Sequence, residues 1–246
     1  MSRMEVYSPE GLRMDGRRWN ELRQFSCQTN THPNASDGSS YVRQGNMVVL
    51  CLVKGPMDTN RATSTTRASA DGPVLNINVS YPPFAGIERK KRSKNERRLS
   101  ELSIVLERCF LKTIVLKNYA RTVIEVNLTI LSFDGGLLAA CCNSITLALI
   151  DAGISLYDYV SAVSVGIYSE TALLDLNSLE ESDLSFVTVG VVGDSDKLNL
   201  IMCEDRLPLD KLERLINLGI QGCHQLRKLM NDTVKEVGVE LLSKRQ

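Results

Sequence analysis

Residues 88–98 form a dense basic cluster that could bind phosphate groups. The segment, ERKKRSKNERR, holds seven basic and two acidic residues, a net charge of +5. Clustered Lys and Arg side chains bind the phosphates of a nucleic-acid backbone without reading its sequence. Arg97 and Arg98 are the stronger candidates, because a helix beginning near Asn95 would hold them in place and guanidinium matches phosphate bidentately. A solvated charged loop or a localisation signal accounts for the same composition equally well.

The turn Asp134-Gly135-Gly136 is a second candidate site. Glycines ahead of a helix let backbone N–H groups approach an anion, and the helix dipole favours negative charge there. The next residues are Leu137 and Leu138, where a phosphate site needs a hydroxyl and a cation. A tight turn that packs the helix is therefore the favoured interpretation.

A third candidate is the acidic segment at residues 175–210, which holds nine carboxylates and two basic side chains, a net charge of −7. Oxygen ligands of this kind suit a hard cation such as magnesium. Acidic surface loops between strands are the favoured explanation. The carboxylates that lie near enough in sequence to act together are Asp175, Glu180, Glu181 and Asp183.

Other catalytic signatures are missing from the sequence. It contains no Gly-x-Ser-x-Gly, Walker or dinucleotide-binding motif. His224 lies on the apolar face of the last predicted helix and is interpreted as a core residue, and His32 lies in a polar loop without an evident partner. The seven cysteines form no Cys-x-x-Cys pair, so they predict small buried side chains in a reducing compartment rather than a zinc site.

Hydrophobic periodicity predicts the strands that must position these candidates. A continuous apolar run at 46–53 and alternating apolar residues at 74–80 and 122–131 indicate three strands. The polar residues Gly55–Pro73 indicate an exposed loop. Further strands are predicted at 160–168, 186–192 and 198–203.

Three helices complete the predicted fold. Apolar residues recur at helical spacing over Asn95–Lys117, with Asn95 as the N-cap. Residues 137–153 are apolar on nearly all sides and predict a buried helix. The last helix begins near Pro208, and its inner stripe is Leu212, Leu215, Ile216, Gly219, Cys223, Leu226 and Met230. Strands followed by helices occur twice without a low-complexity linker, which predicts one compact α+β domain.

The overall composition excludes some classes of protein. The chain has 29 basic and 29 acidic residues, so its net charge of zero excludes a protein that binds polyanions through its overall field. With 43% hydrophobic residues it can bury a sizeable core. No apolar run approaches the ~20 residues of a membrane span. The N-terminus carries charges where a signal peptide needs apolar residues, so we expect an intracellular protein.

Several segments, taken in order, resemble the RNase PH-like family. SPEGLRMDGRRWNELR resembles its R-x-D-G-R motif, and DGSSYVRQGNMVVLCLVKGP is similar to its first hairpin. Four further segments follow in the family's order. They are NERR before a helix, DGG after a strand, ALIDAGI and DLN. The resemblance covers about residues 5–230. Within the family it is greatest to the fungal exosome ring subunit whose archaeal counterpart carries the phosphorolytic site.

The resemblance implies a fold and an assembly. It implies an RNase PH-like fold (ribosomal protein S5 domain 2-like), with two β-α halves in one domain spanning 1–246. We expect the first half at 17–150, the second at 153–220 and a C-terminal helical extension at 221–246. Members of this group assemble as a six-membered ring around an RNA channel.

The resemblance also predicts that catalysis is lost. Active members degrade RNA from its 3′ end with inorganic phosphate, which they bind through a Gly-Gly-(Thr/Ser)-Arg turn. This sequence has Gly135-Gly136-Leu137-Leu138 at that place. An aliphatic side chain cannot offset the charge of phosphate in the transition state. The acidic cluster is disturbed too, because Asn177 stands where a carboxylate is expected and the segment to Asp183 is shortened. We expect no catalytic residue, metal or cofactor.

RNA binding is the remaining expected activity. Arg97 and Arg98 match the paired arginines that contact the RNA backbone in the family, and Lys94 precedes them in the same cluster. Arg61 and Arg67 lie in Met57–Pro73, which matches the channel-entrance region. With 5% aromatic residues, backbone contacts are favoured over base stacking.

The implied partners follow from the same resemblance. They are other RNase PH-like exosome ring subunits, S1/KH-type cap subunits, an associated hydrolytic exoribonuclease and single-stranded RNA, with no membrane. The implied location is the cytoplasm, nucleus and nucleolus.

Two alternatives stay open. The first is an active phosphate-dependent 3′-to-5′ exoribonuclease, with Asp175 and Asp183 as acid/base groups or metal ligands. It requires some residue other than Leu137 and Leu138 to bind phosphate. The second is a small-molecule enzyme on a similar scaffold, which ranks last because the sequence offers no convergent nucleophile and base.

Overall fold

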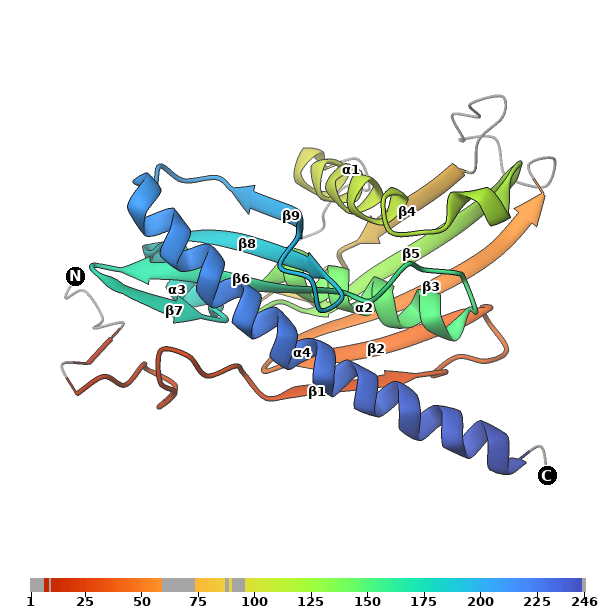
Figure 1. The fold of residues 1–246 in the computed structure, drawn as a ribbon, viewed down its shortest axis with the longest axis horizontal. Helices are drawn as coiled ribbons and strands as arrows, with labels where there is room; N and C mark the ends of the chain where they lie inside the picture. Colours follow the sequence, from red (N-terminus) through yellow and green to blue (C-terminus); the bar gives the residue numbers. More distant parts are fainter. Residues whose placement is uncertain (1–6, 9, 59–73, 87–88, 90–95, 245–246) are drawn as a thin grey trace.

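A computed structural model describes residues 7–8, 10–58, 74–86, 89 and 96–244 of the chain. Within these residues, the strands are β1 (Phe25–Thr29), β2 (Gly38–Gln44), β3 (Met47–Asp58), β4 (Val74–Ser80), β5 (Thr122–Ser132), β6 (Val160–Tyr168), β7 (Thr171–Leu174), β8 (Ser185–Val192) and β9 (Leu198–Cys203). The helices are α1 (Arg97–Leu111), α2 (Leu137–Asp151), α3 (Ser178–Asp183) and α4 (Leu209–Lys244), with a 3₁₀ turn at Leu116–Tyr119. The mixture confirms the predicted α+β class (Figure 1).

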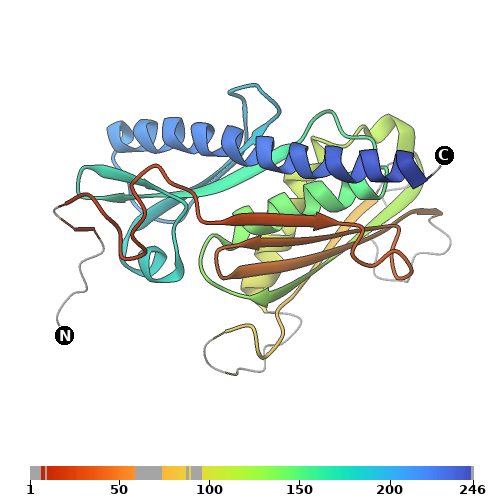
Figure 2. The ribbon, with the colours of Figure 1, turned by 90° about the horizontal axis from the view of Figure 1, so that it is seen from below.

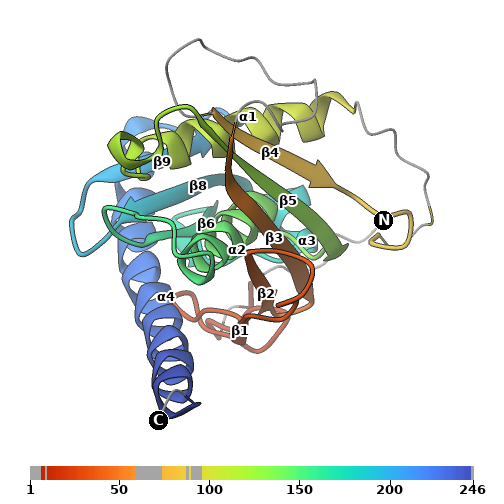
Figure 3. The same cartoon turned by 90° about the vertical axis from the view of Figure 1, so that its right-hand side faces the viewer.

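The strands form two separate sheets. The first has the order β1-β2-β3-β5-β4, in which β4 pairs with β5 in parallel and the other pairs are antiparallel. The second has the order β7-β6-β8-β9 and is antiparallel throughout. Figure 3 views the first sheet close to end-on, with its strands fanned out by twist.

Helix α2 lies between the two sheets and contacts β2 and β3 on one side and β6 on the other. This position explains the predicted buried helix: a helix with apolar neighbours on every side needs no polar face. Its interior polar residues find partners. The Asn143 side chain donates to the carbonyl of Ala162 at 3.0 Å and accepts from the N–H of the same residue at 2.8 Å.

Helix α4 covers the outer face of the second sheet and runs along the length of the molecule (Figures 1 and 2). Its buried residues repeat at helical spacing, as the inner stripe predicted, and they include Leu215, Cys223 and Met230. The helix is continuous over 36 residues. Within the part of the chain that the structure describes, no helix is both long and apolar enough to cross a membrane.

Some predicted boundaries were wrong. The loop expected over Gly55–Pro73 was wrong at its start, because β3 continues to Asp58, where Met57 and Asp58 pair with the start of β5 after a bulge. Residues 59–73 of that prediction lie outside the described residues. The helix expected over Asn95–Lys117 ends at Leu111. There the chain turns to bury Ile114 in the core, where it pairs with Leu156.

The expected N-cap, Asn95, lies outside the described residues, and Glu96 occupies the N-cap position of α1. Three short elements were not predicted, namely β1, β7 and α3. They span four to six residues, too few for a periodic pattern to be recognised.

Candidate functional site

The Gly-Gly turn joins the end of β5 to the start of α2. Gly135 and Gly136 have φ angles of 73° and 67°, in the left-handed region that favours glycine. A Cβ atom at Gly135 would lie 2.5 Å from the backbone carbon of Asn177, so the turn requires glycine in order to approach α3. The structure therefore brings the predicted phosphate turn and the predicted acidic segment together.

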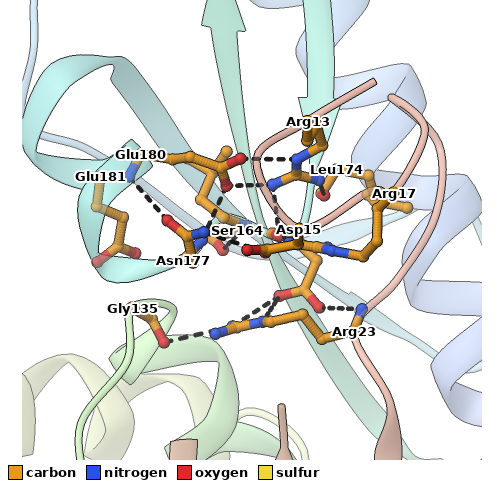
Figure 4. A network of polar contacts seen from close by, with 12 residues as sticks. Arg13, Asp15, Arg17, Arg23, Gly135, Ser164, Leu174, Asn177, Glu180 and Glu181 are labelled. Carbon is orange, nitrogen blue, oxygen red and sulfur yellow. Dashed lines mark hydrogen bonds and ion pairs between the residues drawn. The ribbon is translucent and has the colours of Figure 1, made fainter. Parts of the chain in front are cut away.

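The residues before β1 form an N-terminal strap, defined here as residues 10–24, that crosses the edge of the second sheet (Figure 2). The carbonyl of Trp19 accepts a hydrogen bond of 2.8 Å from the N–H of Leu174, the last residue of β7. Three arginines of the strap, Arg13, Arg17 and Arg23, point into a polar network with the acidic segment (Figure 4).

Arg23 is the arginine nearest to the turn among those drawn in Figure 4, and its charge is already neutralised. Its Nε and Nη2 atoms donate to Oδ1 of Asp175 at 3.0 and 2.8 Å, and its backbone N–H donates to Oδ2 at 2.8 Å. Nη1 donates to the carbonyl of Asp134, and Nη2 donates to the carbonyl of Gly135 at 3.4 Å. Arg23 therefore ties the turn to the acidic segment and is 6% exposed.

Asp175 is fully buried beside Arg23. Burial alone would raise the pKa of this carboxyl, but the Arg23 charge and its hydrogen bonds hold the pKa below its ordinary value. Asp175 is therefore an ionised structural partner of Arg23. The sequence-based alternative that made it an acid/base group does not fit this geometry, because the carboxylate faces a permanent cation rather than a cavity.

A second buried ion pair holds α3. Arg13 Nε donates to Oε1 of Glu180 at 2.8 Å, and its Nη2 donates to Oε2, with both side chains fully buried. Asn177 is the N-cap of α3: its side chain accepts from the N–H of Glu180 at 2.9 Å, while Glu180 accepts from the N–H of Asn177 at 3.0 Å. Asn177 thus caps α3, and its amide nitrogen also donates to Oδ2 of Asp15 at 3.1 Å, a hydrogen bond that an ionised carboxylate at this position could not give.

Glu181 is the carboxylate that meets the turn. Its Oε1 atom accepts a hydrogen bond of 2.6 Å from the N–H of Gly136, the N-cap residue of α2. Burial raises the pKa of Glu181 to about 7, and Asp175 and Asp134 add to the rise, while the Gly136 N–H and Arg23 oppose it. The carboxyl therefore changes charge near neutral pH.

A pocket of about 600 Å³ opens beside Glu181, between the two halves of the protein. Its walls are mainly apolar and come from α1, the start of α2 and strands β8 and β9. Charged side chains line it at four positions, one basic and three acidic. The lining residues are Tyr81, Arg98, Leu99, Glu101, Leu102, Phe133, Leu137, Leu138, Glu181, Phe186, Thr188, Met202 and Glu204.

The structure separates the predicted RNA-binding residues. Arg98 lines the pocket, whereas Arg97 is not among its lining residues and pairs with Glu101 at 2.7 Å, one turn along α1. The Arg97 side chain is 92% exposed. The other three candidates, Arg61, Arg67 and Lys94, lie outside the residues that the structure describes.

Two further residues differ from their predicted roles. Asp183 is exposed at the end of α3 and is not among the residues that line the pocket. His224 is not a core residue: its side chain is 29% exposed, and Nε2 lies 3.5 Å from Oδ1 of Asp196. It lies at the edge of the apolar stripe of α4, where a side chain reaches solvent.

Sequence reasoning missed the strap network and the position of Glu181. In the sequence the strap residues stand out only as a motif, RMDGRR, to which no role was attached. The signal that was available is a group of four arginines, which outnumber the three carboxylates of the same segment. Their partners lie about 150 residues away in the sequence, so spacing could not identify them.

The chain matches known proteins over nearly its whole length. The profile of the 3′ exoribonuclease family, domain 1, matches residues 21–155, and that of domain 2 of the same family matches residues 158–222. The chain is 51% identical over 237 residues to the exosome complex component SKI6 of Saccharomyces cerevisiae, which covers 96% of this chain and 95% of the relative. It is 34% identical to the human exosome complex component RRP41, with 96% of both chains covered.

Two solved structures have the same fold. The rice (Oryza sativa) Rrp46 crystal structure superposes with a TM-score of 0.78 at 25% identity, covering 91% of this chain and all of the other. An Archaeoglobus fulgidus exosome chain, solved with RNA bound to the active site, superposes with a TM-score of 0.74 at 22% identity, covering 89% and 92%. With both family domains present in order and one relative half identical over nearly its whole length, the chain belongs to the 3′ exoribonuclease family and has the RNase PH-like fold.

Proposed function

We propose that this protein is a non-catalytic, RNA-binding subunit of an RNA exosome ring. In this role it guides single-stranded RNA toward an associated hydrolytic exoribonuclease for 3′-to-5′ processing and degradation, including rRNA processing and mRNA turnover. The names of the relatives in yeast and human, both exosome complex components, support membership of such a ring. The partners are other RNase PH-like ring subunits and S1/KH-type cap subunits, in the cytoplasm, nucleus and nucleolus.

The observation that carries the non-catalytic role is the chemistry at the N-terminus of α2. A phosphate site there needs a cation beside the backbone N–H groups, so that the charge of the attacking phosphate is offset. Leu137 and Leu138 provide none, and Arg23, beside the turn, is paired with Asp175. The charged group that contacts this helix end is the Glu181 carboxylate, which has the same sign as phosphate.

RNA binding is assigned to the basic side chains near the pocket. Arg98 is the first candidate, because it lines the pocket and its guanidinium can take a backbone phosphate bidentately. Arg97 adds positive charge at the same helix end, reduced by its pair with Glu101. Arg61, Arg67 and Lys94 remain proposals from the sequence.

RNA decay by a purified, reconstituted ring tests the proposal. We expect no release of nucleoside diphosphates from a 3′-labelled RNA, with or without inorganic phosphate, when the hydrolytic nuclease is left out. The control is a ring whose copy of this subunit carries Leu138→Ala, which must be equally inactive if no phosphate chemistry operates at the turn. Phosphate-dependent release of diphosphates by the wild-type ring would falsify the non-catalytic role.

One observation favours the alternative of an active phosphorolytic exoribonuclease. The pKa of Glu181, raised to about 7 by burial, suits a group that gives or takes a proton at neutral pH. In that case Glu181, rather than Asp175 or Asp183, would be the acid/base group. The decay assay separates the two functions, because only the active enzyme couples RNA loss to consumption of phosphate.

A further inference from the structure

At the N-terminus of α2, the neighbouring residues in the sequence provide no side-chain acceptor for the first N–H groups of the helix. Its N-cap residue, Gly136, has no side chain to accept a hydrogen bond, and the first turn contains no acidic residue. The first N–H groups of a helix need acceptors, and its dipole favours an anion. One of these groups, the N–H of Gly136, donates to the carboxylate of Glu181, which lies 45 residues further along the chain.

Glu181 is held in this position by the helix that carries it. α3 is fixed on one side by the buried pair between Arg13 and Glu180 and at its start by the Asn177 capping box. The backbone of Gly135 packs directly against Asn177. α3 therefore holds the backbone of Glu181 beside the turn, within reach of the N–H of Gly136.

The same carboxylate lines the pocket together with Leu137 and Leu138. An oxyanion that entered the pocket and approached the start of α2 would find the N–H of Gly136 already engaged, at 2.6 Å from Glu181. It would also meet a like charge at contact distance in a partly apolar site, where repulsion is stronger than in water. Leu137 and Leu138 offer no positive charge to a phosphate, whereas the ionised carboxylate of Glu181 repels it.

We propose that Glu181 is a built-in anion that occupies the oxyanion position at the start of α2 and excludes inorganic oxyanions from the pocket. This inference deepens the proposed function, on which it rests, by naming the residue that closes the site. Substituting Leu137 and Leu138 by polar residues would not reopen the site while Glu181 remains.

The titration of Glu181 provides a way to test this role. Facing it are the Gly136 N–H from α2, Arg23 from the strap, and the carboxylates of Asp134 and Asp175. Across the pocket lie Arg98 and Glu101 of α1 and Glu204 after β9. Since the pKa of Glu181 is about 7, the carboxyl is ionised above that pH and becomes neutral below it. Exclusion of oxyanions should therefore weaken as the pH falls through 7.

Sulfate binding to the full-length chain, measured by isothermal titration calorimetry, tests the proposal directly. Sulfate is the probe because it keeps its charge over this pH range, unlike phosphate. At about pH 8, we expect Glu181→Ala to bind sulfate at least about tenfold more tightly than wild type, because one like charge is removed. The matched control is Glu204→Ala, which removes a carboxylate from the same pocket but not from the α2 N-terminus, and it should change affinity by less than about twofold.

The wild-type protein supplies the second arm, which does not depend on the stability of a variant. Its sulfate affinity should rise about tenfold as the pH falls from about 8 to about 6, while that of Glu181→Ala should stay nearly constant. The proposal is overturned if Glu181→Ala binds sulfate no better than wild type, or if Glu204→Ala gains as much. Either result would leave the RNA decay assay unaffected, and phosphate-dependent decay would overturn the proposed function whatever the sulfate result.

Discussion

Arg23, the arginine beside the Gly-Gly turn, shows that a basic residue near a site need not be available to bind an anion. Arg23 lies where a guanidinium could reach a bound phosphate, yet its donors are shared among Asp175, Asp134 and Gly135. A buried guanidinium that is paired with a buried carboxylate has no charge left to offer a ligand. Arg23 therefore ties the turn to the acidic segment, and its donors face protein acceptors.

Replacing Asp175 by Asn should strongly destabilise the protein. Asp175 has a φ of 55°, a left-handed conformation that Asn also tolerates, so the substitution mainly removes charge. Arg23 would keep its positive charge with the partly exposed Asp134, at 3.9 Å, as its remaining ion-pair partner, and removing the buried partner costs about 3–5 kcal/mol. Urea unfolding followed by circular dichroism measures the change.

The matched control for this substitution is Asp183→Asn, in the same segment. Asp183 is exposed, so its loss should change the free energy of unfolding by less than about 0.5 kcal/mol. If Asp175→Asn is as stable as Asp183→Asn, the pair between Arg23 and Asp175 does not hold the turn to the acidic segment.

At the scale of the element, α1 decides which of two adjacent arginines can act at the pocket. Successive residues of an α-helix point about 100° apart, so Arg97 and Arg98 cannot share an orientation. Arg98 lines the pocket itself, whereas Arg97 is not a lining residue and pairs with Glu101, a lining residue on the next turn, which offsets its charge. An exposed pair between residues four apart is worth only a few tenths of a kcal/mol, so it orients Arg97 without fixing it.

Charge reversal along α1 should therefore affect RNA binding unequally. In the reconstituted ring, Arg98→Glu should reduce affinity for a single-stranded homopolymer by about tenfold and lower the salt dependence by about one phosphate contact. Arg97→Glu should have a smaller effect. Fluorescence anisotropy at several salt concentrations measures both quantities.

Arg108 provides the control on the same helix. It is exposed in the last turn of α1, ten residues after Arg98, which places it about 15 Å further along the axis. Arg108→Glu should leave affinity and salt dependence unchanged. Equal losses for Arg98→Glu and Arg108→Glu would indicate a general field effect and not a contact at the pocket.

At the scale of the whole molecule, the N-terminal strap links the two halves of the fold. Arg23 contacts the turn at the end of the first sheet and the loop after β7 in the second, and Arg13 holds α3 (Figure 4). Helix α4 reaches across in the same way, packing on β6 and β8 and touching β1 (Figure 2). Because these contacts join the two halves, the protonation of Asp175 or Glu181 should change the free energy of unfolding of the whole protein.

Stability should reach a maximum near pH 5. The folded pKa of Glu181, about 7, lies above its ordinary value of 4.5, so protonation stabilises the fold increasingly as the pH falls from 7 toward 4.5. The folded pKa of Asp175 lies below its ordinary value of 3.8, so its contribution is present above that value and is lost as the pH falls through the folded pKa.

Melting temperature as a function of pH checks this expectation. Wild type should gain stability between about pH 8 and about pH 5 and lose it below about pH 4. Glu181→Gln, which keeps a neutral acceptor for Gly136, should not gain stability over the upper range. A wild-type profile that is flat between about pH 8 and about pH 5 contradicts the raised pKa of Glu181.

Periodicity alone determined much of the fold. The strands at 74–80, 160–168 and 198–203 have the bounds that the sequence pattern predicts, and the buried helix begins at Leu137 as its apolar run predicts. These elements follow from short-range physics, because alternation places side chains on two faces of a strand and an all-apolar helix must be enclosed. The amino-acid sequence also identifies the Gly-Gly turn and the leucines that stand where a phosphate site needs an arginine.

Only the tertiary structure decided what the charged residues do. Sequence spacing could not pair Arg13 with Glu180, Arg23 with Asp175 or Glu181 with Gly136, because each pair joins segments far apart in the chain. Whether a carboxylate binds a metal, caps a helix or neutralises an arginine depends on its neighbours in space and on its burial. The sequence by itself determined the family and the longer elements, and the packing of the strap and α3 against the turn determined the chemistry of the site.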